Sequence, residues 1–149
     1  MDETRKASLR LFLRLTLVAT LCFILGNSLL PREESAEISG GLASWLMSLG
    51  IPIEDDGFLR KLAHFAEFGL LGTELTLLLR LRGIKGMQNI CLSALTAFFI
   101  AAADETIQIF SGRGAQISDV LLDFAGGVTG ILLCNLLLQR FLKGYRSRL

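Results

Sequence analysis

The amino-acid sequence predicts an all-α membrane protein, a bundle of four transmembrane helices. Of the 149 residues, 52% are hydrophobic and only 19% are charged, whereas about a quarter of a typical soluble domain is charged. The charges cluster in short blocks, and the apolar stretches between them approach the roughly 20 residues that a helix needs to cross a bilayer. These stretches lack the alternation of a barrel strand. Helices, which satisfy every backbone amide internally, are therefore the expected spanning elements.

Four stretches have the required length and composition. They are residues 11–30, 58–79, 87–110 and 117–139. The first follows several basic residues, as a signal core does, but its apolar run is longer and no A-x-A-like cleavage site follows it. We therefore expect an uncleaved anchor and one domain over residues 1–149.

Basic residues are distributed unevenly between the two sides of the predicted bundle. The side with the N-terminal flank, the second loop and the C-terminal tail carries 11 of the 15 basic residues. The other side carries Arg32, Arg60, Lys61 and Arg113, together with an acidic run in the first loop. Because Lys and Arg favour the cytoplasmic side, we expect both termini in the cytoplasm and the first and third loops outside.

The first external loop, residues 31–57, is long enough to contain structure of its own. After an acidic start, apolar residues recur in it at helical spacing, at Ile38, Leu42, Trp45, Leu46 and Leu49. This pattern is typical of a short helix that lies in the outer membrane interface, with Trp45 as its anchor. The alternative is a packed loop helix without a binding role.

Glycines on the second and fourth spans permit close contact with neighbouring helices. Gly126, Gly127 and Gly130 form a small-residue face on the fourth span, and Gly69 and Gly72 lie on the second. Small residues let helix backbones approach closely inside a membrane. We expect these positions to serve packing and no chemistry.

Ionisable residues occur at one depth in three of the predicted spans. Such a residue costs roughly 2.5–3.5 kcal/mol at the centre of a membrane helix, so it persists where it faces another polar group or a wet cavity. With a rise of 1.5 Å per residue, His64, Asp104 and Asp123 each lie about 9 Å from the outer end of their helix. The sequence therefore predicts that three helices bring these residues together.

Further polar residues share the faces of the same helices, because residues three or four apart are neighbours on a helix surface. By this spacing, Lys61 and Glu67 join His64, Gln108 joins Asp104 and Glu105, and Asp119 joins Asp123. All of them lie in the outer half of the predicted bundle. We therefore predict a polar pocket that opens outward.

Structural roles are alternatives for several of these residues. Asp119 begins its helix, where a carboxylate complements the helix dipole. Lys61 is shallow enough for its ammonium group to reach the interface. Arg113 is either an ordinary loop charge or a counter-ion for the acidic pocket. The deeper group around His64 is either a site or a structural network.

Three segments, residues 60–69, 104–114 and 118–130, carry a specific combination of residues. It consists of Lys61, His64, Phe65, Glu67, Asp104, Glu105, Gln108, Phe110, Asp119 and Asp123, with Arg113 in the loop. The combination resembles the VanZ-like family, with residues 58–138 as the motif-bearing core. The resemblance implies a multi-pass protein of the bacterial cytoplasmic membrane. The family's namesake is associated with resistance to teicoplanin-type glycopeptides, and the resemblance implies no particular reaction.

Two classes of function follow from these residues. One is an intramembrane enzyme acting on an envelope lipid or lipid-linked precursor, with His64, Glu67, Asp104, Glu105 and Asp123 as candidate catalytic residues. A divalent metal is a candidate cofactor on His64, Glu67, Asp104 and Asp123, because imidazole and carboxylate groups suit such an ion. Lys61, Gln108, Arg113 and Asp119 are then candidate substrate-binding residues for an anionic head group.

The other class is non-catalytic. It comprises a lipid or glycopeptide binder, a small transporter and a structural partner in an envelope complex. The outward-only position of the buried charges argues against a continuous pore. For both classes we expect membrane lipids as partners, with an envelope precursor or a glycopeptide as further candidates, and no nucleic acid.

Overall fold

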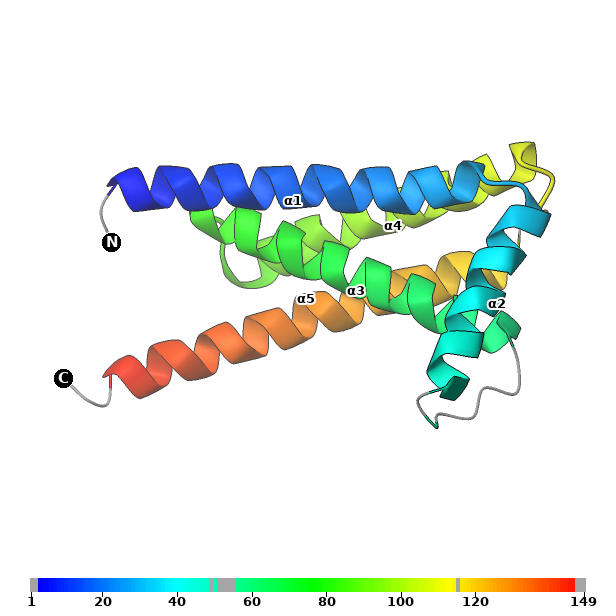
Figure 1. The fold of residues 1–149 in the computed structure, drawn as a ribbon. Coiled ribbons are helices and arrows are strands. Elements are labelled where there is room, and N and C mark those ends of the chain that lie inside the picture. The colour runs from blue at the N-terminus through cyan, green and yellow to red at the C-terminus, as the bar shows by residue number, and fades with distance from the viewer. Residues whose placement is uncertain (1–2, 49, 51–55, 115, 147–149) are drawn as a thin grey trace.

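The computed structural model describes residues 3–48, 50, 56–114 and 116–146, and these ranges contain five helices. In chain order they are α1 (Glu3–Leu29), α2 (Arg32–Ser48), α3 (Asp56–Leu81), α4 (Gly86–Phe110) and α5 (Ile117–Arg146). Figure 1 shows the four long helices α1, α3, α4 and α5 lying lengthwise, with α2 crossing one end of them. The all-α fold predicted from the sequence is confirmed for this part of the chain.

Four of the described helices are long and apolar enough to cross a membrane. Their spans are Glu3–Leu29, Gly57–Leu81, Gly86–Phe110 and Ile117–Phe141. The number of spans confirms the prediction, but the first helix begins well before residue 11. The basic flank continues the helix because it contains no Gly or Pro, and Lys6 and Glu3 pair one turn apart at 2.6 Å.

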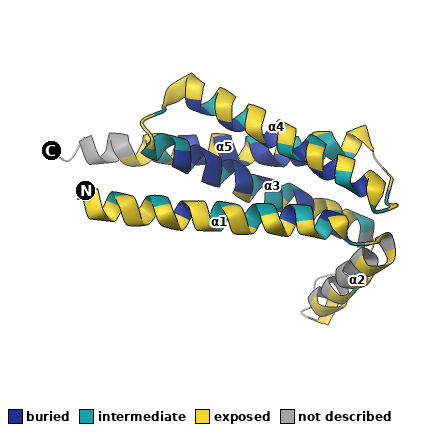
Figure 2. Ribbon diagram, turned by 90° about the horizontal axis from the view of Figure 1, so that it is seen from above, coloured by how far each residue is buried: buried dark blue, intermediate teal, exposed yellow. Residues whose placement is uncertain are grey.

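Large apolar side chains cover the outside of the bundle. On α1 they include Leu11, Phe12, Leu15, Val18 and Phe23. Figure 2 shows that most of α1 is exposed, whereas the buried surface gathers along α3 and α5. Such an apolar exterior suits contact with lipid hydrocarbon. A water-soluble monomer would rarely expose so large an apolar surface.

Helix α3 is the centre of the bundle, since it contacts each of the other four helices. Its packing against α5 depends on glycines. A Cβ at Gly130 would collide with the backbone of Gly69, and a Cβ at Gly72 would collide with the backbone of Gly127. Thr73 Oγ1 of α3 also donates to the Gly130 carbonyl of α5 at 3.4 Å. The close helix contact expected at these glycines is therefore present, and the structure shows that the two sets of glycines face each other.

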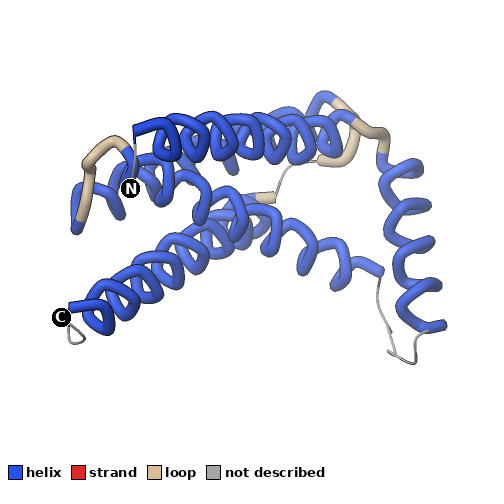
Figure 3. Tube along the Cα trace, turned by 60° about the vertical axis from the view of Figure 1, so that its left-hand side comes forward, coloured by secondary structure: helices blue, strands red, loops and turns tan. Residues whose placement is uncertain are grey.

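The end of the bundle that carries α2 holds the polar site. Figure 3 shows α2 standing beyond the ends of the long helices, and α2 packs there against α3. The helix predicted in the first loop is thus present, with Trp45 exposed. The side chains of Ile38, Leu42 and Leu46 lie outside the described set, as do the residues Leu49, Glu54 and Asp55. An interfacial location for α2 stays a prediction.

The described beginning of α1 and the described end of α5 lie at the opposite end of the bundle (Figure 1). An even number of spans requires this arrangement. Those basic residues that predict the sidedness and that the structure describes gather at this end, where Arg10 Nη2 donates to the Leu81 carbonyl at 3.0 Å. The cytoplasmic location of this end stays a prediction. The assignment of residues 1–149 to a single domain also stays a prediction.

Candidate functional site

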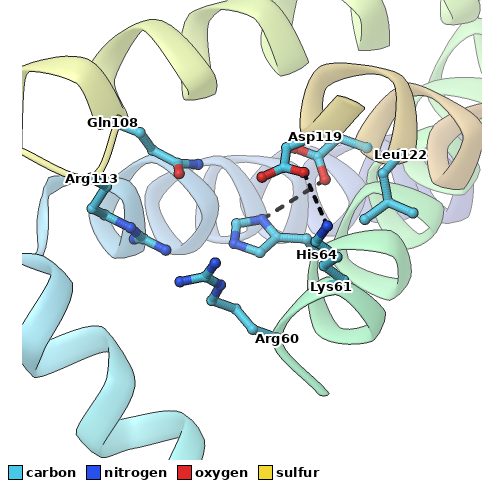
Figure 4. Close-up of a pocket in the computed structure, with 8 residues that line it drawn as sticks. Arg60, Lys61, His64, Gln108, Arg113, Asp119 and Leu122 are labelled. Carbon is cyan, nitrogen blue, oxygen red and sulfur yellow. Dashed lines mark ion pairs between the residues drawn. The ribbon is translucent and has the colours of Figure 1, made fainter. Parts of the chain in front are cut away.

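A pocket opens at the end of the bundle near α2. It lies where α3 and α5 begin, where α4 ends and where the α4–α5 loop crosses. Figure 4 shows the lining residues, which are Arg60, Lys61, His64, Gln108, Arg113, Asp119, Leu122 and Asp123. The space that they surround is about 280 Å³, including the open volume at the mouth. Residues from three helices and one loop therefore share one cavity.

A cluster of three ionisable residues lies at the inner side of the pocket, and it consists of His64 of α3, Asp104 of α4 and Asp123 of α5. His64 and Asp123 line the pocket, whereas Asp104 is buried behind them. One ligand-type atom from each lies within 4.8 Å of the others. Their exposed fractions are 7%, 0% and 2% in the same order. The convergence predicted from their common depth along the helices is present, and we call this group the His–Asp–Asp cluster.

Asp104 is held by neutral donors on both of its oxygens. Ser28 Oγ makes a short hydrogen bond to Oδ1, and Gln108 Nε2 donates to Oδ2 at 2.9 Å. Ser28 lies on α1 and is fully buried. All four long helices therefore contribute to the site, although the sequence pattern pointed only to α3, α4 and α5.

His64 is oriented toward Asp123 without a hydrogen bond to it. Their atoms Nδ1 and Oδ1 lie 3.9 Å apart, which exceeds the hydrogen-bond range. Nδ1 is buried, and it has no hydrogen-bond partner among the described residues. A buried ring nitrogen without such a partner is costly. It is therefore a candidate position for a ligand atom.

Cationic side chains surround the mouth of the pocket. The guanidinium groups of Arg60 and Arg113 extend into the same space beside His64 (Figure 4). Arg113 Nη1 also donates to the Asn27 carbonyl at 3.0 Å, which fixes the loop against α1. Arg60 was not among the predicted site residues, although it lies four residues before His64 and so shares its face.

Lys61 and Asp119 form an ion pair at the rim. Their atoms Nζ and Oδ1 are 3.6 Å apart, and the Lys61 side chain is 48% exposed. Asp119 lies in the first turn of α5, where its charge also complements the helix dipole. Both residues line the pocket.

Glu67 and Glu105 lie outside the His–Asp–Asp cluster and outside the pocket lining. Glu67 is half-buried one turn further along α3. Glu105 Oε1 accepts a hydrogen bond from the backbone amide of Gln116 at 2.5 Å. This bond ties the end of α4 to the segment that leads into α5. A catalytic role for either glutamate stays a prediction.

The arrangement offers two kinds of chemistry. The mouth can bind an anion, because Arg groups pair with phosphate or carboxylate in a bidentate manner. The His–Asp–Asp cluster can accept and donate protons, or it can hold a cation, because it combines an imidazole with two carboxylates.

Comparison with known families agrees with the resemblance seen in the three segments. The family model described as VanZ/LLP1 matches residues 10–138. This match extends the similarity from the predicted core into α1, the helix whose Ser28 contacts Asp104. No curated protein and no solved structure matches the chain significantly.

Proposed function

Because this chain belongs to the VanZ/LLP1 family of membrane proteins, we propose that it binds the phosphate-bearing head group of a membrane lipid or of a lipid-linked envelope precursor. One observation carries this proposal: the guanidinium groups of Arg60 and Arg113 extend into the same space at the mouth of the pocket (Figure 4). The head group would occupy the space between them.

Charge supports an anionic ligand. Two guanidinium groups that approach each other repel, and an anion between them removes that repulsion. Arg60 makes no ion pair with the part of the chain that the structure describes. Guanidinium groups match the geometry of phosphate oxygens and form short, charge-assisted hydrogen bonds to them. Lys61 adds a third positive charge, which it shares with Asp119.

Size and position support a lipid head group. The pocket is small and open at its mouth, so a head group would enter from outside while the acyl chains stay in the lipid. Arg60 lies in the second turn of α3, and Arg113 lies in the α4–α5 loop. Both are near the ends of the spans, at the level of the lipid head groups. Exposed apolar side chains on the adjoining helices would contact the acyl chains.

Sidedness connects this activity to the bacterial envelope. The excess of basic residues at the opposite end of the bundle favours an outer-leaflet position for the pocket. A protein that binds envelope lipids or precursors there would act where teicoplanin-type glycopeptides meet their targets. The resistance association of the family's namesake motivates this part of the proposal.

Modification of the bound head group is a second function, and one observation favours it over simple binding. His64 lines the same pocket as the arginines and lies against two buried carboxylates. A head group held at the mouth would therefore be adjacent to groups that can exchange a proton with it. Mass spectrometry of lipids incubated with the purified protein tests for a changed head group, and His64→Ala should abolish any change.

The binding proposal is tested with the full chain in detergent. Native mass spectrometry measures the fraction bound to phosphatidylglycerol, to undecaprenyl phosphate and to a neutral diacylglycerol. We expect binding of the two phosphate lipids and weak binding of diacylglycerol. Arg60→Gln should weaken phosphate-lipid binding by about tenfold, which corresponds to roughly 1.4 kcal/mol.

Arg82→Gln is the matched control, because Arg82 is an exposed arginine at the opposite end of the bundle. It should leave phosphate-lipid binding unchanged. Equal binding by wild type, Arg60→Gln and Arg82→Gln would contradict the proposal. Preference for one of the two phosphate lipids would separate a bulk phospholipid from a lipid-linked precursor.

A further inference from the structure

The His–Asp–Asp cluster buries two carboxylates without a matching positive charge. Asp104 and Asp123 are essentially inaccessible. Among the described residues, neither has an ion pair with Lys or Arg. The hydrogen bonds to Asp104 come from Ser28 and Gln108, which are neutral. Two buried like charges this close strongly oppose each other, so a cation or a proton has to compensate them.

We propose that His64, Asp104 and Asp123 bind a divalent metal ion of the Zn²⁺ or Mn²⁺ class. Their candidate ligand atoms lie within 4.8 Å of one another. Ligand atoms of one tetrahedral ion with bonds of about 2.1 Å lie about 3.4 Å apart. Binding of one ion would therefore require side-chain rotations that bring these atoms closer together. His64 adds a second observation to the two buried acids. Its buried Nδ1 is directed at Asp123 but has no hydrogen-bond partner among the described residues, so it is available as a metal ligand.

Neighbouring groups support the ligands as they do in protein metal sites. Hydrogen bonds from Ser28 and Gln108 hold both oxygens of Asp104 in place. Such contacts orient metal ligands, and their loss commonly costs about 10–100-fold in metal affinity. Each carboxylate oxygen has a second lone pair, so it can accept a hydrogen bond and still coordinate an ion. Asp104 therefore has the geometry of a pre-oriented ligand.

The ligand types select the class of ion. Imidazole suits Zn²⁺ and related transition metals, whereas carboxylates alone suit Mg²⁺ and Ca²⁺. One imidazole with two carboxylates therefore favours Zn²⁺ or Mn²⁺ over Mg²⁺. Three protein ligands leave a coordination position open, as catalytic zinc sites do. His64 and Asp123 line the pocket, so this open position would face the space assigned to the head group.

This proposed set is narrower than the four ligands expected from the sequence, because it omits Glu67. Glu67 lies outside the group of three. The two sets therefore predict different outcomes for Glu67→Gln, and this variant is the matched control. It changes a carboxylate on the same helix as His64, one turn away.

The test uses the full chain in detergent, stripped with EDTA and without added lipid. Elemental analysis after addition of Zn²⁺, Mn²⁺ or Mg²⁺ should find about one Zn²⁺ or Mn²⁺ per chain, as a single three-ligand site requires, and less Mg²⁺. The melting temperature should rise with Zn²⁺ or Mn²⁺, because an ion that binds only the folded state stabilises it. Glu67→Gln should show the same stoichiometry and the same shift.

Asp123→Asn distinguishes a metal site from a structural network. Without metal it should melt at or above the wild-type temperature, because the repulsion between two buried acids is removed. With metal it should show no shift. His64→Gln, which retains a polar side chain, provides a second variant with the same expected loss of the metal effect. Arg60→Gln should bind metal normally. A failure of the metal proposal can therefore be told apart from a failure of the lipid-binding proposal.

Three results would overturn the proposal. Absence of a bound ion and of any shift in the wild type would leave protons as the compensating charge. A normal metal shift in Asp123→Asn and His64→Gln would place the ion elsewhere. Loss of the shift in Glu67→Gln would reinstate the four-ligand set.

Discussion

The two ends of the helical bundle bury polar side chains in different ways. At the pocket end, an imidazole and two carboxylates lie together, and two of the three residues line an open cavity. At the opposite end, the buried polar groups include two amides that are bonded to backbone, Asn89 and Asn135. Asn89 Nδ2 donates to the carbonyls of Thr76 and Ile84, each at 3.1 Å. Asn135 Nδ2 donates to the Ile131 carbonyl at 2.9 Å.

This difference separates structural polar groups from functional ones. An amide that bonds a loop carbonyl fixes the turn between two helices, and it adds no net charge to the interior. Charges that are gathered without compensation oppose folding, so their persistence points to a ligand. Glu74 shows that burial alone is not the criterion. It is a buried carboxylate in α3, but it belongs to no cluster of metal-ligating residues among those described.

The contact between α3 and α5 joins two helices that run between both ends of the bundle. Breaking it should therefore lower the free energy of unfolding more than any other proposed substitution. Gly130→Ala places a Cβ against the carbonyl of Gly69 and 3.0 Å from its Cα. Backbone cannot yield as a flexible side chain does, and overpacking costs about 1–3 kcal/mol. We expect the free energy of unfolding in detergent to fall by about that amount, together with lipid and metal binding.

Gly26→Ala is the control for this substitution. Gly26 lies in α1, and a Cβ there would meet no atom within 4 Å. Because Ala favours a helix over Gly by about 1 kcal/mol, this variant should be as stable as the wild type or more stable. Equal destabilisation by both substitutions would show that the glycine contact does not hold the helices together.

The second prediction tests the end of the bundle away from the pocket. Asn89→Ala removes both donors to the Thr76 and Ile84 carbonyls. Leaving buried acceptors without a partner costs about 1–3 kcal/mol, and we expect the lower part of this range. Affinities for phosphate lipids and for metal should not change. The exposed neighbour Gln88→Ala should alter neither stability nor binding, and a loss of lipid binding in Asn89→Ala alone would contradict the separation of the two ends.

The sequence predicted the four spans and the convergence of His64, Asp104 and Asp123. It could do so because hydropathy identifies a span, and the rise per residue gives the depth of each charged group along its helix. Depth does not give direction around the helix. Glu67 shares a broad face with His64 in the sequence, but it lies about 4.5 Å deeper along α3, and it falls outside the cluster.

Two residues of the site left only weak signals in the sequence. Ser28 is uncharged, so it does not stand out at the end of an apolar span, and its contact with Asp104 depends on how α1 packs against α4. Arg60 was counted only among the basic residues of the outer side of the bundle. Its position four residues before His64 was the available signal. Both residues reach the site because of how the helices pack against one another, and the sequence alone does not give that packing.

The third prediction asks whether charge at the pocket end serves function. Asp104→Asn removes one of the two buried charges and retains the acceptor for Ser28. Gln108 can rotate its amide to suit the new side chain. We expect the free energy of unfolding without metal to change by less than about 1 kcal/mol or to rise, because the repulsion is relieved. Metal binding and any effect on teicoplanin susceptibility should be lost.

Paired measurements separate the two explanations for Asp104. Thermal unfolding in detergent reports stability, and the susceptibility of cells that express each variant reports function. The control is Glu74→Gln, which neutralises a buried carboxylate outside the cluster and should retain function. Strong destabilisation by Asp104→Asn, or full function in it, would support a structural network at the pocket end.

The smallest effect is expected at the rim. Asp119→Asn breaks the 3.6 Å pair with Lys61, and such partly exposed pairs contribute only about 0–1 kcal/mol. Loss of a favourable charge in the first turn of α5 should cost stability by a similarly small amount. The release of Lys61 and the removal of a negative charge should tighten phosphate-lipid binding by about two- to fivefold, which is less than about 1 kcal/mol.

Lys61→Gln is the opposite change at the same pair, and it should weaken phosphate-lipid binding by a similar factor. Native mass spectrometry in low salt measures both variants, because added salt screens charges at this exposure. Opposite shifts would mean that Asp119 acts on the ligand through charge alone. If Asp119→Asn instead weakens binding as Lys61→Gln does, the carboxylate accepts a hydrogen bond from the head group. Asp119 would then be the substrate-binding residue that the sequence predicted, and the ligand would carry a hydroxyl beside its phosphate.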